Sequence, residues 1–214
     1  MRYDTVIFDL DGTLLDTLDD LTDGVNHALA DFGYPLAGRG EIRSRLGYGS
    51  GHLIAESVPG GRDNPNYQAV FDDYLEFYRA HSSVKTAPYP GTMELLASLK
   101  KRGVRTAIVS NKPDSATQEL YEHWFASAVE TAVGEREGIR RKPAPDSLLE
   151  IMRRLGAGKE RTVYIGDSEV DIQTAAAAGV DCISCTWGFR TREQLIAAGA
   201  SALVDDMASL EKLL

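Results

Sequence analysis

Short apolar runs alternate with longer amphipathic segments along most of the chain. The runs end in small or acidic residues, which is typical of buried strands, and they cover residues 6–8, 104–109, 128–133, 163–165 and 180–185. Between the later runs, residues 91–102, 145–155 and 169–178 place apolar side chains at helical spacing. Strands that alternate with helices predict an α/β fold, with a doubly wound parallel sheet covered by helices on both faces.

The interval between the first and second predicted strands is too long for a single crossover helix, because a whole βαβ unit takes only about 30 residues or slightly more. Apolar residues recur at helical spacing from Leu18 to Phe32 and from Val70 to Tyr78, and two shorter helical stretches surround Ile42 and Leu53. We therefore expect residues 16–87 to form an inserted helical domain, within a core of residues 1–15 and 88–214. The aromatic side chains between residues 67 and 78 are expected to form the core of the insert.

Polar side chains lie where three of the predicted strands end. The segments are Asp9-Leu10-Asp11-Gly12-Thr13, Ser110-Asn111-Lys112 and Gly166-Asp167-Ser168-Glu169-Val170-Asp171, and Lys142 lies in the loop before the fourth strand. The carboxyl ends of parallel strands share one edge of the sheet, so we expect these side chains to converge. Carboxylates packed together repel one another unless a cation lies between them. Hard oxygen ligands suit Mg²⁺ and leave room for a substrate phosphate, whereas softer metals would recruit His or Cys.

The residue types then predict roles in phosphate chemistry. Asp9 can attack phosphorus and form an aspartyl-phosphate. Asp11 can protonate the leaving oxygen and then activate water, as general acid and base. Gly12 lets the backbone approach the phosphate closely.

The other polar residues at this edge are expected to bind the phosphoryl group and the metal. Ser110 and Lys142 can hold the phosphoryl oxygens and offset their charge. Asp167, with Asp9 and the Asp11 carbonyl, can hold Mg²⁺, and Asp171 can act directly or through water.

Composition limits the partners of the protein. The 214 residues include 23 Lys and Arg against 32 Asp and Glu, a formal charge of −9, which argues against nucleic acid and anionic membrane surfaces. No apolar run is long enough to span a membrane, and the first residues lack a secretory signal, so we expect a cytoplasmic protein. The phosphate-binding residue types predict a small phosphorylated metabolite as its partner, and the sequence leaves monomer and homodimer open. Cys182 and Cys185 lie three apart on a predicted strand and should face opposite sides of the sheet, which argues against a redox or zinc pair.

At the residues named above, the chain resembles the haloacid dehalogenase superfamily of phosphatases, which has a Rossmann-like core. Residues 9–14 match the DxDGT signature, Ser110-Asn111 the second motif, Lys142-Pro143 the third, and residues 166–171 the fourth. Residues 166–172 and Trp187-Gly188-Phe189-Arg190 are most similar to bacterial phosphoglycolate phosphatases. The resemblance implies Mg²⁺-dependent hydrolysis of a phosphomonoester, with 2-phosphoglycolate as the best candidate.

The resemblance also implies that the insert is a mobile cap and that Thr13 and Asn111 help to bind phosphate. The cap segment that contains Arg45, Gly47 and Tyr48 is placed to meet the non-phosphate end of the substrate. Arg45 either pairs with a glycolate carboxylate or is an exposed helix arginine, and the same two interpretations hold for Arg190 and Arg192.

Three other functions share these residue types. A sugar phosphomutase would use the same aspartyl-phosphate but return the phosphate to a sugar. A different sugar-phosphate or pyrophosphate hydrolase of the superfamily would share much of the motif set. A receiver-like phosphoacceptor module also uses clustered Asp, Ser or Thr, Lys and Mg²⁺, but it predicts a chain without a cap and a long-lived aspartyl-phosphate.

Overall fold

The computed structural model describes residues 2–214 and divides the chain into two compact units. The sheet unit contains the residues up to Leu15 together with Pro88–Leu214, and the helical unit contains Asp16–Ala87. Within residues 2–214 no helix combines the length and the apolar character that crossing a membrane requires.

The sheet unit is built on six parallel strands in the order β5-β4-β1-β6-β7-β8. Along the chain these are β1 (Thr5–Phe8), β4 (Arg105–Pro113), β5 (Thr131–Glu135), β6 (Thr162–Gly166), β7 (Asp181–Cys185) and β8 (Leu203–Val204). The first strand lies inside the sheet, and Phe8 is in register with Ile108 of β4 and Ile165 of β6. The strands that carry the motifs are therefore neighbours.

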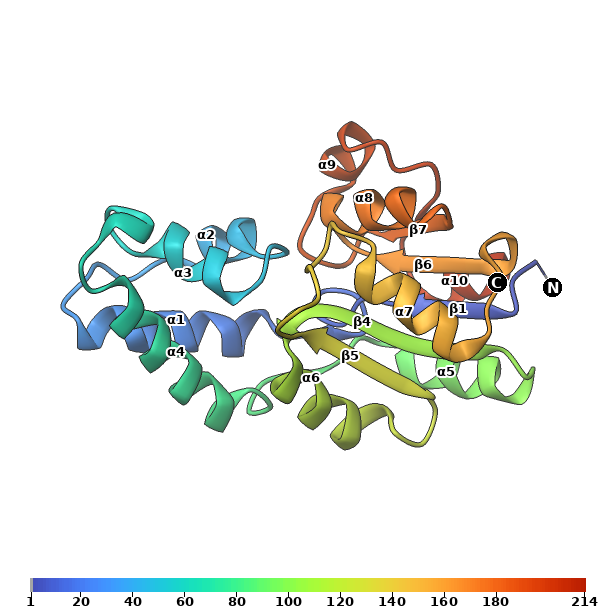
Figure 1. The fold of residues 1–214 in the computed structure, drawn as a ribbon, viewed down its shortest axis with the longest axis horizontal. Coiled ribbons are helices and arrows are strands. Elements are labelled where there is room, and N and C mark those ends of the chain that lie inside the picture. The colour runs from blue at the N-terminus through green and yellow to red at the C-terminus, as the bar shows by residue number, and fades with distance from the viewer. Residues whose placement is uncertain (1) are drawn as a thin grey trace. The chain divides into compact units, whose positions relative to one another are not determined.

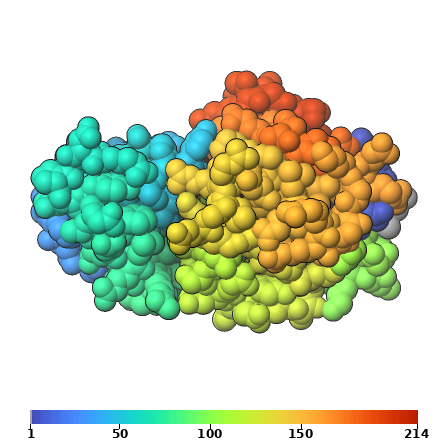
Figure 2. Space-filling view, viewed as in Figure 1, coloured from blue at the N-terminus to red at the C-terminus, as the bar shows by residue number. Residues whose placement is uncertain are grey.

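Helices cover both faces of this sheet, as the sequence predicts (Figure 1). Side chains of α7 (Asp146–Leu155) and α8 (Glu169–Ala178) pack with Ile7 on one face. Side chains of α5 (Thr92–Lys101), α6 (Asp114–Leu120) and α10 (Met207–Leu213) pack with Phe8 on the other. On the face drawn in Figure 2, the surface of this unit is formed mainly by segments coloured light green to orange, which contain α6 and α7. The chain is completed here by η2 (Tyr121–Phe125), η3 (Lys159–Arg161) and α9 (Arg192–Ala197).

Two strands differ from the predicted ranges. Residues 128–130 lie outside β5, because the N–H groups of Ala128 and Val129 close a turn onto the Phe125 carbonyl. β4 continues to Pro113, so Ser110, Asn111 and Lys112 lie within it rather than after it. Gly134 of β5 permits this, since a Cβ there would lie 2.5 Å from the Lys112 carbonyl oxygen.

The two cysteines of β7 face opposite sides of the sheet, which confirms the prediction from their spacing. Cys185 belongs to the apolar cluster that contains Phe8, whereas Cys182 packs against the cluster that contains Ile7. Both thiols are free, and burial raises the pKa of Cys182 to about 12. The pair therefore has neither the geometry nor the thiolate character of a redox site.

The helical unit contains α1 (Leu18–Asp31), α2 (Arg39–Arg45), α3 (Ser50–Ser57), η1 (Gly61–Asp63) and α4 (Tyr67–His81). Val25, Leu29 and Tyr74 are fully buried where α1 and α4 pack together. The two chain segments that enter and leave the unit pair with each other as a small sheet, β2 (Leu15–Asp16) with β3 (Ala87–Pro88). Close to them, the buried Asp20 carboxylate accepts the backbone N–H groups of Lys85 and Thr86.

Candidate active site

Parallel register brings three of the sequence motifs to one edge of the sheet. Asp9 follows β1, Ser110 lies near the end of β4, and Asp167 follows β6. The Asp9 N–H donates to the Ile165 carbonyl at 2.8 Å, so the backbone remains tied to β6 at the first catalytic candidate. Asp9, Ser110 and Asp167 are all at least nine-tenths buried.

Lys142 supplies a buried positive charge at this edge. Its Nζ lies 2.9 Å from Asp9 Oδ2 and 2.8 Å from Asp171 Oδ1, and it donates to the Tyr164 hydroxyl at 3.0 Å. Burial alone would lower the pKa of Lys142, but the carboxylates of Asp171 and Asp9 outweigh it and raise that pKa well above its ordinary value. Lys142 is therefore a fixed cation beside the nucleophile candidate.

The side chain of Asn111 holds Lys142 in place. Its Oδ1 accepts the Lys142 N–H at 2.8 Å, and its Nδ2 donates to the Lys142 carbonyl at 2.9 Å. Both ends of the Asn111 amide are thus used on one backbone residue. Asn111 was expected to bind phosphate, and in the structure its side chain positions the backbone of Lys142.

Tyr164 belongs to this cluster but was not predicted from the sequence, because it lies inside an apolar strand and has the pattern of a core residue. Its hydroxyl donates to the Val109 carbonyl at 3.0 Å, accepts from Lys142 Nζ, and lies 3.3 Å from Asp171 Oδ1. Burial raises the pKa of Tyr164 well above its ordinary value, so the hydroxyl keeps its proton. It anchors the ammonium of Lys142 to the backbone of β4.

Asp167 is held by the loop that follows β7. Its Oδ2 accepts the Phe189 N–H at 2.6 Å, and its Oδ1 accepts from the Thr13 hydroxyl at 3.3 Å. Thr13, expected to bind phosphate, therefore orients Asp167 with its side chain. Burial and then the charge of Asp171 raise the pKa of Asp167 to about 7 in the metal-free protein.

Two glycines let the loops approach Asp167. A Cβ on Gly188 would lie 2.3 Å from the Gly12 carbonyl oxygen and 2.4 Å from Asp167 Cβ. Gly12 has φ +80°, and a Cβ there would lie 2.5 Å from Asp167 Oδ2. The Trp187 indole N–H donates to the Thr13 carbonyl at 3.0 Å and ties the same two loops together. Each residue of Trp187-Gly188-Phe189 thus helps to hold Asp167 or the loop that contains Gly12.

Asp171 has both carboxylate oxygens engaged by protein donors. Oδ1 is paired with Lys142, and Oδ2 accepts the N–H groups of Asp167 and Ser168 and the Ser168 hydroxyl at 2.7 Å. Burial would raise the pKa of Asp171, but Lys142 and the Ser168 hydrogen bonds outweigh it and lower that pKa. Asp171 is thus an ionised residue whose oxygens mainly hold Lys142 and the loop after β6.

The residues present fit a hard divalent cation. Carboxylate oxygens of Asp9, Asp167 and Asp171 lie within 4.8 Å of one another, and all three side chains are buried. Burial raises the pKa of Asp9 well above its ordinary value, with Lys142 opposing the rise. A bound cation would reverse that direction, because it favours the ionised form of each carboxylate.

Asp11 is paired with a lysine that sequence reasoning gave no role. Asp11 Oδ1 lies 3.0 Å from Lys112 Nζ, whose side chain is only 2% exposed, whereas that of Asp11 is 18% exposed. The nearby Ser110 hydroxyl oxygen accepts the Lys112 N–H at 3.2 Å. Asp11 is therefore partly open to solvent and forms an ion pair with a buried lysine.

The expected specificity residues lie in the helical unit, at the end of α2 and in the loop after it. Arg45 Nη2 lies 3.6 Å from Glu41 Oε1, and Arg45 Nη1 donates to the Ser57 hydroxyl at 3.3 Å. Gly47 has φ +111°, and the Tyr48 ring lies 5.1 Å from that of His52.

Arg190 and Arg192 lie in the sheet unit and have acidic partners there. Arg190 forms a bidentate pair with Glu169 at 2.7 and 2.9 Å and is 6% exposed, and Arg192 pairs with Asp205. Arg190 braces the start of α8 beside the metal candidates.

Comparison with known proteins identifies the family of this chain. The family model for haloacid dehalogenase-like hydrolases matches residues 6–185. A phosphoglycolate phosphatase of Rhodospirillum rubrum is 34% identical over 213 residues, which cover 96% of this chain and 88% of that protein. The phosphoglycolate phosphatase of Pseudomonas putida is 32% identical over 211 residues, which cover 96% and 77% respectively.

Solved structures give the same result. A crystal structure from Lactobacillus delbrueckii subsp. bulgaricus, of a protein provisionally named phosphoglycolate phosphatase, has a TM-score of 0.95 and 36% identity and covers 100% of this chain and 98% of that one. CbbY from Rhodobacter sphaeroides in complex with phosphate has a TM-score of 0.82 and 26% identity, and the match covers 97% and 96% of the two chains. The chain therefore belongs to the haloacid dehalogenase-like hydrolase family, among its phosphoric monoester hydrolases.

Proposed function

We propose that this protein hydrolyses 2-phosphoglycolate to glycolate and phosphate through an aspartyl-phosphate on Asp9, with Mg²⁺ as cofactor. The observation that carries the proposal is the ion pair between Asp9 Oδ2 and Lys142 Nζ, which are 2.9 Å apart. The acid/base candidate Asp11 follows Asp9 by two residues at the same edge of the sheet. Family membership removes the receiver-like alternative, because that module is not a hydrolase.

The first half of the reaction forms the covalent intermediate. A carboxylate oxygen of Asp9 attacks phosphorus, and the bond from phosphorus to the ester oxygen breaks. Asp11 donates its proton to that oxygen, so glycolate leaves as an alcohol. Lys112, 3.0 Å from Asp11, stabilises the carboxylate that remains.

The second half regenerates the enzyme. Asp11 accepts a proton from water, the water oxygen attacks phosphorus, and the bond between phosphorus and Asp9 breaks to release phosphate. Lys142 and Ser110 offset the charge on the phosphoryl oxygens in both halves. Mg²⁺, when bound by Asp9, Asp167 and the Asp11 carbonyl, supplies further positive charge there, and Asp171 acts through Lys142 and water.

The proposed nucleophile is tested by Asp9→Asn, with release of phosphate from 2-phosphoglycolate as the readout. We expect turnover to fall by at least about 1000-fold, since the amide cannot form the intermediate. Asp4→Asn is the matched control, because Asp4 is an exposed aspartate of the same unit paired with Arg161. Phosphate release that survives in the Asp9→Asn protein would refute the assignment.

The substrate needs its own experiment, because CbbY has also been crystallised with xylulose-1,5-bisphosphate, at 26% identity to this chain. The assay compares 2-phosphoglycolate with that bisphosphate, a sugar monophosphate and pyrophosphate, and it follows both free phosphate and transfer to another hydroxyl. Preferential release of phosphate from 2-phosphoglycolate supports the proposal. Preference for a sugar ester or pyrophosphate, or phosphate transfer without release, identifies one of the alternative functions instead.

Recognition of the substrate carboxylate is the proposed task of Arg45. We expect Arg45→Ala to raise KM for 2-phosphoglycolate about tenfold more than KM for a neutral phosphomonoester, since a charge-assisted pair contributes about 1.5–3 kcal/mol. Arg39→Ala is the control, because Arg39 is an exposed arginine of the same helix paired with Asp19. Equal effects on both substrates would make Arg45 a structural residue of α2.

A further inference from the structure

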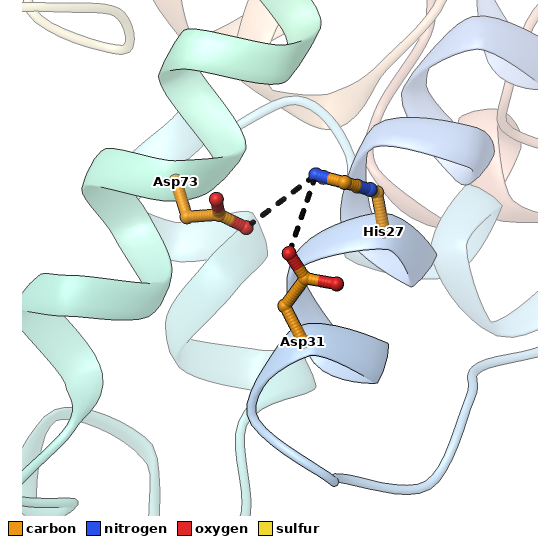
Figure 3. A group of neighbouring side chains, drawn as sticks. All are labelled: His27, Asp31 and Asp73. Atoms are coloured by element: carbon orange, nitrogen blue, oxygen red, sulfur yellow. Dashed lines mark ion pairs between the residues drawn. The ribbon is translucent and has the colours of Figure 1, made fainter.

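A second cluster of metal-ligating side chains lies within the helical unit, between α1 and α4. His27 and Asp31 are one turn apart on α1, and Asp73 projects toward them from α4 (Figure 3). The His27 Nε2 atom lies 3.7 Å from Asp31 Oδ2 and 3.9 Å from Asp73 Oδ2. All three ligand atoms lie within 4.8 Å of one another.

These distances leave the facing atoms without hydrogen bonds. A protein N–H···O bond spans about 2.7–3.2 Å, so neither carboxylate bonds to the imidazole. The Asp73 Oδ2 atom is fully buried and has no hydrogen-bond partner. Across the described residues, no lysine or arginine forms an ion pair with Asp31 or Asp73. The three side chains are 29–55% exposed, so two carboxylates and an imidazole converge at a site that a dissolved ion can reach.

Aromatic stacking fixes the orientation of the imidazole. The His27 ring stacks on Phe77 with centroids 4.0 Å apart and planes 22° apart. Phe77 stacks in turn on His81, also at 4.0 Å, and His81 Nδ1 lies 2.8 Å from the Phe77 carbonyl oxygen. Stacking thus fixes the plane of the His27 ring, and the Nε2 atom in that plane faces the two carboxylates.

We propose that His27, Asp31 and Asp73 bind a divalent transition-metal ion of the zinc class, which links α1 to α4. One imidazole nitrogen and two carboxylate oxygens are ligands that Zn²⁺ accepts at about 2.0–2.2 Å, with water in a remaining position. Atoms about 2.1 Å from a tetrahedral ion are about 3.4 Å apart. The His27 Nε2 atom, 3.7 and 3.9 Å from the two carboxylate oxygens, is therefore close to the spacing of such a site, and side-chain rotation would bring the two carboxylates together around the ion. Imidazole distinguishes this donor set from the all-oxygen catalytic cluster.

The inference is tested by metal binding to the full-length protein, after chelation and in excess Mg²⁺. Wild-type protein should bind a Co²⁺ ion with visible absorption that His27→Ala does not bind. The Zn²⁺ affinity of this site should fall by more than about 100-fold, because changes outside the ligand shell alone cost about 10- to 100-fold. Asp73→Asn keeps the side-chain volume and should lose the same ion. His123→Ala, which removes an exposed histidine of the sheet unit, should keep it.

The competing explanation is a protonated His27 attracted to two carboxylates. In that case all the proteins bind the same number of Co²⁺ ions with the same spectrum, and Zn²⁺ raises the melting temperatures of wild type and His27→Ala equally. Either result overturns the proposal. Circular dichroism of each variant establishes that it is folded. The comparison does not depend on the proposed reaction, because the catalytic cluster is unchanged in all of these proteins.

Discussion

Gly188 is the residue whose replacement tests the architecture of the proposed metal site most directly. In Gly188→Ala the new methyl group would lie 2.3 Å from the Gly12 carbonyl oxygen and 2.4 Å from Asp167 Cβ. Cβ contacts shorter than 3.0 Å are essentially never observed, so one of the two loops must move by at least about 0.7 Å. That movement displaces Asp167 from the Phe189 N–H and from the other carboxylates.

The expected size of the effect follows from the cost of overpacking. An extra methyl group in a well-packed region costs about 1–3 kcal/mol. If Mg²⁺ binding must restore the original position of Asp167, that cost weakens binding by roughly 5- to 150-fold. We therefore expect the Mg²⁺ concentration for half-maximal phosphate release to rise by this factor.

The assay is a Mg²⁺ titration of phosphate release, accompanied by the melting temperature of each protein. Gly158→Ala is the matched control, because no atom would lie within 4 Å of its new Cβ and its φ is −83°. Our reasoning is refuted if Gly188→Ala is folded and shows the same Mg²⁺ dependence as wild type and Gly158→Ala.

Two further predictions concern Tyr164 and Asp167. Tyr164→Phe removes a hydrogen-bond partner of Lys142 and should lower kcat about 5- to 30-fold with little change in KM. The control is Tyr3→Phe, which removes a hydroxyl bonded to Asp181 and should leave kcat unchanged. Equal kcat values for the two variants would contradict the positioning role of Tyr164. The pKa of Asp167 is about 7 in the metal-free folded protein and ordinary when unfolded, so its stabilising effect is complete below about pH 4 and is lost as the pH rises through 7. Mg²⁺ requires the ionised carboxylate, so it should raise the melting temperature more at about pH 8 than at about pH 5. Asp167→Asn should weaken both trends, since only Asp9 then keeps a raised pKa in the cluster, and a pH-independent effect of Mg²⁺ on wild type would contradict this reasoning.

The sheet and the acidic cluster were predictable because both follow from local pattern. Buried strands appear as apolar runs, and parallel strands carry their final residues to one edge, which is enough to bring Asp9 and Asp167 together. The limits of β4 were less accessible, since its extension to Pro113 depends on a glycine in a neighbouring strand. The two-residue strand β8 lies in the short apolar run Ala202-Leu203-Val204, which was not among the predicted strands.

The supporting residues of the site could not be found by the same reasoning. Tyr164 alternates with apolar neighbours, so nothing local distinguishes a hydroxyl that anchors Lys142 from one that fills a core. Lys112 and Gly188 act through contacts with residues distant in the chain, and such contacts depend on tertiary structure. Neither residue belongs to a periodic apolar pattern that would have indicated its contacts. Sequence reasoning thus identified the groups proposed to do chemistry and missed several that hold them.

The pairing of β2 with β3 has a consequence for how this architecture can change. β2 and β3 are hydrogen-bonded to each other, and the Tyr89 N–H donates to the Leu14 carbonyl at 3.0 Å. The two ends of the insertion are thus held next to each other. Their positions at the sheet unit can stay the same whether the segment between them is a short turn or a whole domain. Mutation can lengthen, shorten or replace that segment while the residues at the sheet edge stay in place. With the proposed role of Arg45 in substrate recognition, selection could act on substrate choice and on catalysis as nearly separate traits.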